Sequence, residues 1–147
     1  MQKLLLATLT ILLLLLLITS PLHADWPEES GILEPVQIFD QHYGTDQMNK
    51  VAQVVTDDFR DGKSKPEWTA DVSRQLREIR YERMDSEIRG VVSNEDTATV
   101  LMRVNIGSLV GPVEHDEVFR LVRDEDRWLI DELEVSNEQN KPPGIEI

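Results

Sequence analysis

The chain has 147 residues and no cysteine, which excludes disulfides, thiol chemistry and attachment of a lipid through a cysteine. It carries 28 acidic residues against 15 Lys and Arg, giving a net charge of −13, and every acidic residue follows Ala24. A domain this acidic repels nucleic acid and anionic membrane surfaces, because both are bound by neutralising phosphates; neither is an expected partner.

The start of the chain has the layout of an export signal. Lys3 precedes an apolar run over residues 4–18 that only two threonines interrupt. About fifteen residues are fewer than the roughly twenty that a membrane-spanning helix needs, and Ala24 offers a small residue for cleavage. We expect a signal peptide over residues 1–24 and an extracytoplasmic domain, periplasmic or secreted. A membrane anchor over residues 4–18 is the alternative.

Three helices are predicted after a linker over residues 25–34. Pro35 suits a first helical turn, Asp46 can cap the second helix, and Ser64 with Glu67 forms a capping box before the third. Apolar residues recur at helical spacing in each segment. They are Val36, Phe39 and Tyr43; then Met48, Val51, Ala52, Val55 and Phe59; then Trp68, Val72, Leu76 and Ile79.

After Tyr81 the apolar residues alternate, which predicts antiparallel strands. The four strands are expected over residues 84–92, 97–106, 113–123 and 127–135. In the first strand one side is expected to carry Met84, Ser86, Ile88, Gly90 and Val92. The apolar positions change parity between Ile130 and Leu133, which predicts a bulge. The polar tail, residues 136–147, has too little apolar surface to fold and is expected to be disordered.

Helices followed by a meander of strands indicate an α+β domain with its helices on one face of the sheet. The element order over most of residues 35–135 resembles the nuclear transport factor 2-like superfamily. Two fragments carry the resemblance: the closing Trp128-Leu129-Ile130-Asp131 and the strand Thr97-Ala98-Thr99-Val100 after an acidic turn. It implies a cystatin-like cone, in which a curved four-stranded antiparallel sheet wraps three helices and leaves a cavity at the wide end.

The resemblance also extends to a steroid-isomerase branch, in which a helix Tyr and a protonated strand acid hold an enolate oxygen while a third carboxylate moves the proton. Tyr43 can stand for the first of these groups. The sequence offers no matching pair of acids, so this activity is not inferred from the resemblance.

His115 and Tyr43 are the candidate catalytic residues, and with Trp68 they are the candidate ligand-binding residues. Strand parity places His115 on the inward face with Phe119 and Leu121, where imidazole can exchange protons near neutral pH. Glu114 and Asp116 point the other way, so no carboxylate is expected to orient the ring. A rim residue without function is the alternative for His115, and ordinary core packing is the alternative for the aromatic residues.

No metal site or cofactor is predicted. The acidic runs at residues 114–117 and 124–126 lack the alternating ligands and glycine of a calcium loop, so solvated turns explain them.

An apolar patch is expected on the outer face of the sheet, and such a patch is typical of an interface. This predicts a homodimer through the face that carries Val91, Leu101, Val118, Val122 and Leu129.

The sequence favours a non-enzymatic module that binds a small apolar ligand or a protein partner, because no nucleophile, base and orienting group come together. A small-molecule isomerase or hydratase that uses His115 or Tyr43 in the cone is the first alternative. An accessory domain tethered to the membrane by residues 4–18 is the second.

Overall fold

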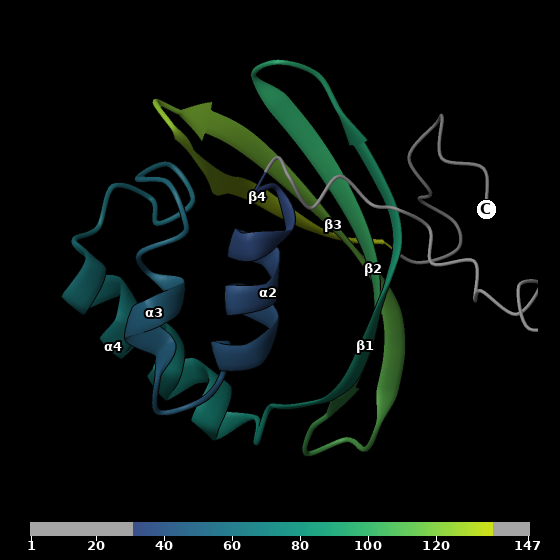
Figure 1. Ribbon diagram of the computed structural model, residues 1–147. Helices are drawn as coiled ribbons and strands as arrows, with labels where there is room; N and C mark the ends of the chain where they lie inside the picture. Colours follow the sequence, from purple (N-terminus) through teal and green to yellow (C-terminus); the bar gives the residue numbers. More distant parts are fainter. Residues whose placement is uncertain (1–30, 137–147) are drawn as a thin grey trace, which may run out of the picture.

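The computed structural model describes residues 31–136, so the predicted signal peptide and the tail beyond Ser136 lie outside the described residues. The described elements are α2 (Leu33–His42), α3 (Met48–Val51), α4 (Lys65–Glu78), β1 (Glu82–Ser93), β2 (Thr97–Gly107), β3 (Val113–Asp124) and β4 (Arg127–Ser136). The strands form one antiparallel sheet in the order β1-β2-β3-β4 (Figure 1). The α+β class and the four-stranded meander are therefore confirmed.

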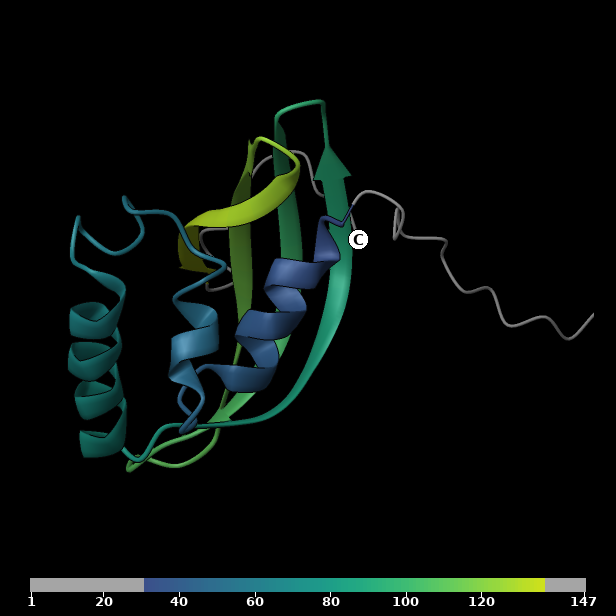
Figure 2. The ribbon, with the colours of Figure 1, turned by 60° about the vertical axis from the view of Figure 1, so that its left-hand side comes forward.

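The curved sheet wraps around α2, while α3 and α4 lie on the side of α2 away from the sheet (Figures 1 and 2). Helices α2 and α3 supply most of the buried helical residues of the core, and α4 adds Trp68 from the side away from the sheet. Among the described residues, no helix is long and apolar enough to cross a membrane.

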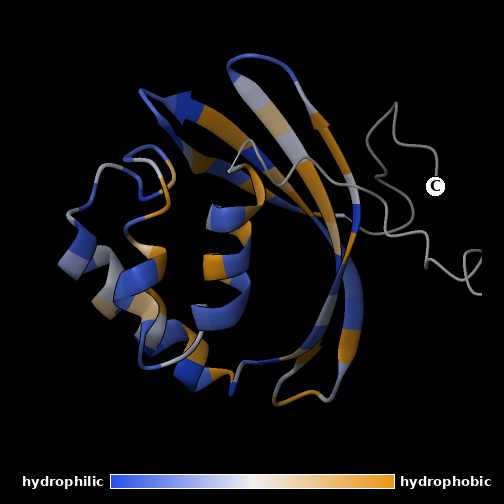
Figure 3. Cartoon of the chain, in the orientation of Figure 1, coloured by the Kyte–Doolittle hydropathy of each residue, from blue (hydrophilic) through white to orange (hydrophobic). Residues whose placement is uncertain are grey.

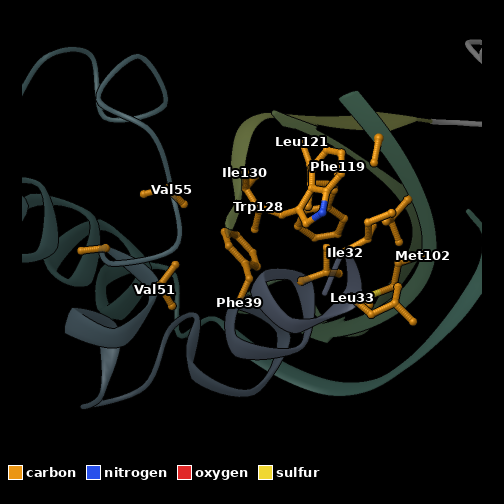
Figure 4. Close-up of a cluster of buried hydrophobic side chains, with 14 of the residues drawn as sticks. Ile32, Leu33, Phe39, Val51, Val55, Met102, Phe119, Leu121, Trp128 and Ile130 are labelled. Atoms are coloured by element: carbon orange, nitrogen blue, oxygen red, sulfur yellow. The ribbon is translucent and has the colours of Figure 1, made fainter. Parts of the chain in front are cut away.

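The core lies between α2 and the concave face of the sheet. Phe39 of α2 packs edge-on against Phe119 of β3 at a ring centroid distance of 5.2 Å. Trp128, Leu121 and Ile130 gather around the same two rings (Figure 4). Because Phe39, Met102 and Phe119 are almost completely buried, side chains occupy the space between α2 and the sheet.

The predicted linker, residues 25–34, overlaps the start of the first helix. The helix begins at Leu33, two residues before Pro35, and both Ile32 and Leu33 are buried in the core. Burial of these two side chains explains the earlier start, because they extend the apolar stripe of α2 back by one turn.

The second predicted helix is shorter than expected. Its buried residues match the prediction, but α3 ends at Val51, and Val55 instead forms a parallel bridge with Ile130 of β4. The buried Arg60 side chain holds the intervening loop by donating to the carbonyl oxygens of Ala52, Val55 and Lys63. Over residues 52–63 the bridge to β4 and the hydrogen bonds from Arg60 therefore replace the helical hydrogen bonds that were expected.

The capping box before α4 is confirmed in its first half. The Ser64 side chain accepts a hydrogen bond from the backbone N–H of Glu67 at 3.4 Å, and Pro66 lies in the first turn. Trp68 is buried, but Ile79, expected on the same stripe, is 47% exposed because α4 ends at Glu78.

The strand boundaries agree with the prediction to within two residues, and the bulge in β4 is confirmed. Asp131 is the extra residue, since Arg120 pairs with Glu132 and Leu121 pairs with Ile130. The single-sided pattern expected for the first strand is wrong. Two irregularities in its pairing, after Arg83 and after Ile88, change the facing of the residues that follow.

Candidate functional site

Five polar side chains meet inside the cone and form what we call the cone cluster: Asp40, Tyr81, Arg83, His115 and Glu117. Helix α2 supplies the first, the start of β1 the next two, and the inward face of β3 the last two. The structure therefore assembles this site from three segments that are distant in sequence.

Arg83 is the centre of the cone cluster. Its two terminal nitrogens donate to the two carboxylate oxygens of Glu117 at 3.0 and 2.9 Å, and its Nε donates to Asp40 Oδ1 at 2.9 Å. The guanidinium also lies 5.8 Å from the ring centroid of Phe39. Its side chain is 6% exposed and that of Glu117 is 4% exposed, so both charges are buried together.

His115 has a carboxylate partner, contrary to the sequence analysis. Its Nε2 lies 3.1 Å from Glu117 Oε1. The expected inward facing is confirmed, because His115 pairs with the buried Val104 across the β2–β3 ladder. From the sequence only Glu114 and Asp116 are considered as partners, although the two-residue period that turns His115 inward does the same for Glu117.

Two tyrosines close one side of the cone cluster. The Tyr43 ring stacks on Phe39 at 4.4 Å and meets Tyr81 edge-on at 5.6 Å. Tyr81 also packs against Gly44, where a Cβ would come within 2.7 Å of its ring and where φ is +83°, so glycine is required there. Tyr43 and His115 thus lie near the same buried charges.

The electrostatics of the cone cluster fix its protonation. Burial alone would raise the pKa of Glu117, but hydrogen bonds from His115 and Arg83 outweigh it and lower that pKa. Burial would likewise lower the pKa of Arg83, but its bonds to Glu117 raise it. The pair is therefore ionised. An oxyanion site of the isomerase kind needs a protonated strand acid, and Glu117 is held in the opposite state.

Trp68 does not join the cone cluster. It lies on α4, packs edge-on against Phe59 at 6.0 Å, and belongs to the hydrophobic core. The structure therefore brings two of the three expected ligand-binding residues toward one place and leaves the third in the core.

Two open hollows lie outside the cone, next to the helices. The helix groove has a volume of about 480 Å³ and runs between α3 and α4. Its lining is Asn49, Ala52, Gln53, Lys65, Pro66, Thr69, Ala70, Ser73 and Arg77. The basic hollow has a volume of about 380 Å³ and lies between the loop after α3 and the β3–β4 turn. Its lining is Gln53, Val55, Thr56, Asp57, Arg60, Lys65, Val122, Arg123, Asp124, Arg127 and Leu129.

The helix groove contains an unused polar atom. The Oγ1 atom of Thr69 is buried and has no hydrogen-bond partner within residues 31–136. The atom is shielded from solvent, so its unpaired state is a local cost of the packing beside the groove.

The outer face of the sheet does not present the expected apolar patch. Leu101 and Val118 are 2% and 0% exposed, and Val91 packs against the core because the irregularity after Ile88 turns it inward. Val122 and Leu129 line the basic hollow. The homodimer through this face stays a prediction. The exposed apolar surface that suggested it is not found at Leu101 and Val118.

Apolar stretches of the chain lie instead at the end of α4 and at the β2–β3 turn (Figure 3), and several of their residues are exposed. They include Ile79, Met84, Leu109, Val110 and Val113. The backbone N–H of Leu109 donates to the carbonyl of Ile79 at 2.9 Å, which holds the turn against the end of α4.

The described part of the chain holds no group of three or more acidic, His or Cys side chains arranged to bind a metal ion.

Comparisons with known proteins identify the fold. No protein-family model and no curated protein matches this chain. A SEC-C motif containing protein from Rhodopseudomonas palustris matches with a TM-score of 0.60 and 15% identity, covering 74% of this chain and 80% of that chain. A nuclear transport factor 2-like protein of unknown function from Shewanella oneidensis MR-1 matches with a TM-score of 0.54 and 14% identity, over 76% and 100% of the two chains.

A ketosteroid isomerase-like protein from Erwinia carotovora atroseptica also matches, with a TM-score of 0.52 and 20% identity over 71% of this chain and 92% of that chain. At these identities the likeness shows the fold alone. It confirms the resemblance inferred from the sequence.

Replacing Glu117 by Gln is expected to lower the free energy of unfolding by about 3 kcal/mol at neutral pH, because Arg83 would stay charged and buried without its main partner. Glu132→Gln removes an exposed carboxylate of the same sheet and is the matched control. It should change the free energy of unfolding by less than about 1 kcal/mol. Urea denaturation measures both variants.

The effect of Glu117→Gln should depend on pH. The folded pKa of Glu117 lies below its ordinary value of 4.5, so its stabilisation is complete above that pH and is lost as the pH falls through the folded pKa. The stability difference between wild type and variant should therefore shrink below about pH 4.5. A difference that grows on acidification would contradict the buried ion pair.

Tyrosine ionisation should also report the cone cluster. Burial, with the charges of Tyr81 and Glu117, raises the pKa of Tyr43 from 10.0 to about 12, and burial raises that of Tyr81. The chain has 2 tyrosines, so the ultraviolet absorbance of tyrosinate should not appear near pH 10 in the folded protein but should do so in urea. The folded state should lose stability above pH 10, where only the unfolded chain ionises. Tyr81→Phe isolates the Tyr43 signal.

Proposed function

We propose that this chain, which has the nuclear transport factor 2-like fold, is a non-enzymatic binding module that holds a small, largely apolar ligand in the helix groove. One observation carries the proposal: the cone interior is occupied by buried side chains, while an open groove of about 480 Å³ lies between α3 and α4. Its floor includes Ala52, and Pro66 and Ala70 add apolar surface along α4. Pockets for small ligands are mostly apolar with a few polar groups, and Asn49 and Ser73 are polar residues of this lining.

The cone cluster supports the same proposal because its carboxylates already have hydrogen-bond partners within the protein. Glu117 is shared between Arg83 and His115, and Asp40 accepts from Arg83 and from Ser86. A general base must be able to accept a proton near the working pH, whereas Arg83 and His115 hold Glu117 in its ionised form well below neutrality. The carboxylates of the cone cluster therefore act as structural partners of Arg83.

The proposal is tested by filling the groove. Ala70→Trp places a large side chain on its wall, and Ala70 is exposed, so the fold should be retained. Nile red, a neutral apolar dye, should bind the wild type with enhanced fluorescence and lose at least tenfold in affinity in Ala70→Trp.

The matched control is Gln75→Trp, which adds the same side chain to an exposed position of α4 outside the groove. It should bind the dye as the wild type does. Equal weakening in both variants, or no binding to the wild type, would overturn the groove as a ligand site.

A small-molecule enzyme is the second candidate, and the contact between His115 and Glu117 favours it. If Nε2–H of His115 donates to Glu117, the carboxylate orients the ring and leaves Nδ1 as the proton acceptor, the arrangement found where histidine acts as a base. We expect a panel of isomerase and hydratase substrates to show no turnover that His115→Ala or Tyr43→Phe abolishes. Turnover lost in both variants but kept in Ala70→Trp would establish the enzyme and replace the binding proposal.

We also propose that the domain works outside the cytoplasm, because Lys3 and the apolar run over residues 4–18 have the layout of an export signal. In a tethered accessory domain the same run would remain as an anchor.

A further inference from the structure

The helix groove and the basic hollow adjoin each other. Gln53 and Lys65 line both, and Lys65 Nζ donates to Gln53 Oε1 at 2.7 Å. This single side-chain contact lies between the two hollows. A ligand that displaces the Gln53 amide from Lys65 can therefore extend from one hollow into the other.

The two hollows carry positive charge in a protein whose net charge is −13. In the basic hollow Asp57 pairs with Arg60 and Asp124 pairs with Arg127, so two of the four cations are neutralised. Lys65 and Arg123 are not, because no described carboxylate forms an ion pair with either side chain. The helix groove has no acidic residue in its lining and adds Arg77 at the far end of α4.

The shape of the helix groove suits an extended apolar chain. Its lining residues on α4 lie along one side of the helix from Lys65 to Arg77, a length of about 18 Å at 1.5 Å per residue. Ala52, Pro66 and Ala70 offer small apolar contacts along this length. The groove therefore offers apolar contacts along its course and has a cation at each end, Lys65 where it meets the basic hollow and Arg77 at the other end.

We propose that the ligand is a single-chain amphiphile with an anionic head group, a carboxylate or a phosphate. Its chain lies in the helix groove, and its head lies in the basic hollow between Lys65 and Arg123. This inference rests on the proposed function and adds the class of ligand to it.

The overall negative charge of the protein does not oppose a ligand of this size. At physiological ionic strength charges more than about 8 Å apart are largely screened, so a small head group responds mainly to the side chains of the hollow. An extended anionic surface, such as a duplex or a bilayer, would instead meet many of the protein's acidic side chains at once, in a chain of net charge −13. The inference therefore concerns a single soluble amphiphile.

The test is isothermal titration calorimetry with decyl phosphate, decanoate and neutral decyl maltoside, each below its micelle concentration. Decyl phosphate or decanoate should bind, and Lys65→Gln and Arg123→Gln should each weaken binding about tenfold, the usual worth of a charge-assisted hydrogen bond. Arg120→Gln removes an exposed cation outside both hollows and is the matched control. It should leave the affinity unchanged. The stronger of the two anionic ligands identifies the head group.

Chain length gives a second readout. Octyl phosphate lacks two methylenes and should bind about tenfold more weakly than decyl phosphate if the chain is buried in the helix groove. Inorganic phosphate alone should bind more weakly still, and Ala70→Trp should remove the dependence on chain length.

The outcomes separate this inference from the proposed function. Equal binding of decyl maltoside, unaffected by Lys65→Gln, would leave the groove as an apolar site and overturn the anionic ligand. Binding of inorganic phosphate as tight as that of decyl phosphate would overturn the amphiphile. If no decyl compound binds the wild type, both the inference and the proposed function fail.

Discussion

Arg83 connects three parts of the molecule that are far apart in the sequence. From β1 it reaches Glu117 on β3 with two hydrogen bonds and Asp40 on α2 with a third. The curved sheet can wrap around α2 only if the charge at their contact is neutralised, because an unpaired buried guanidinium is strongly destabilising. Glu117 and Asp40 provide that neutralisation, and Phe39 covers the planar face of the cation.

The same contacts keep Glu117 ionised in an interior that side chains occupy. A catalytic carboxyl group needs a pKa near the working pH and free space beside it. Glu117 has a lowered pKa and two partners, and the neighbouring Met102 and Phe119 are almost completely buried. The fold is shared with a ketosteroid isomerase-like protein. One fold can carry many different sites, so fold likeness alone does not assign an activity.

The sequence predicts the regular helices and strands of this structure. It misses the features that depend on contacts between segments distant in the sequence. The alternation in β2 and β3 agrees with the prediction because every residue of their shared ladder has a regular partner, and in β4 the predicted bulge at Asp131 accounts for the change of parity. The facing of β1 was not, since two irregularities reverse it and sequence periodicity gives no sign of them. His115 was placed correctly, but its partner Glu117 was overlooked. Arg83 had no sequence signal, because its role depends on contacts with α2 and β3.

The irregular segments of the chain also shape the basic hollow. The bulge at Asp131 turns its carboxylate toward Thr56, whose hydroxyl donates to it at 2.8 Å. That contact and the bridge from Val55 to Ile130 hold the loop after α3 along β4, and Arg60 fixes the loop from within. A continuous helix from Met48 to Phe59 would not carry a loop at this position, so the basic hollow between it and the β3–β4 turn would be lost. The shortening of the predicted helix and the formation of the basic hollow thus have one cause, which is the pairing of the loop after α3 with β4.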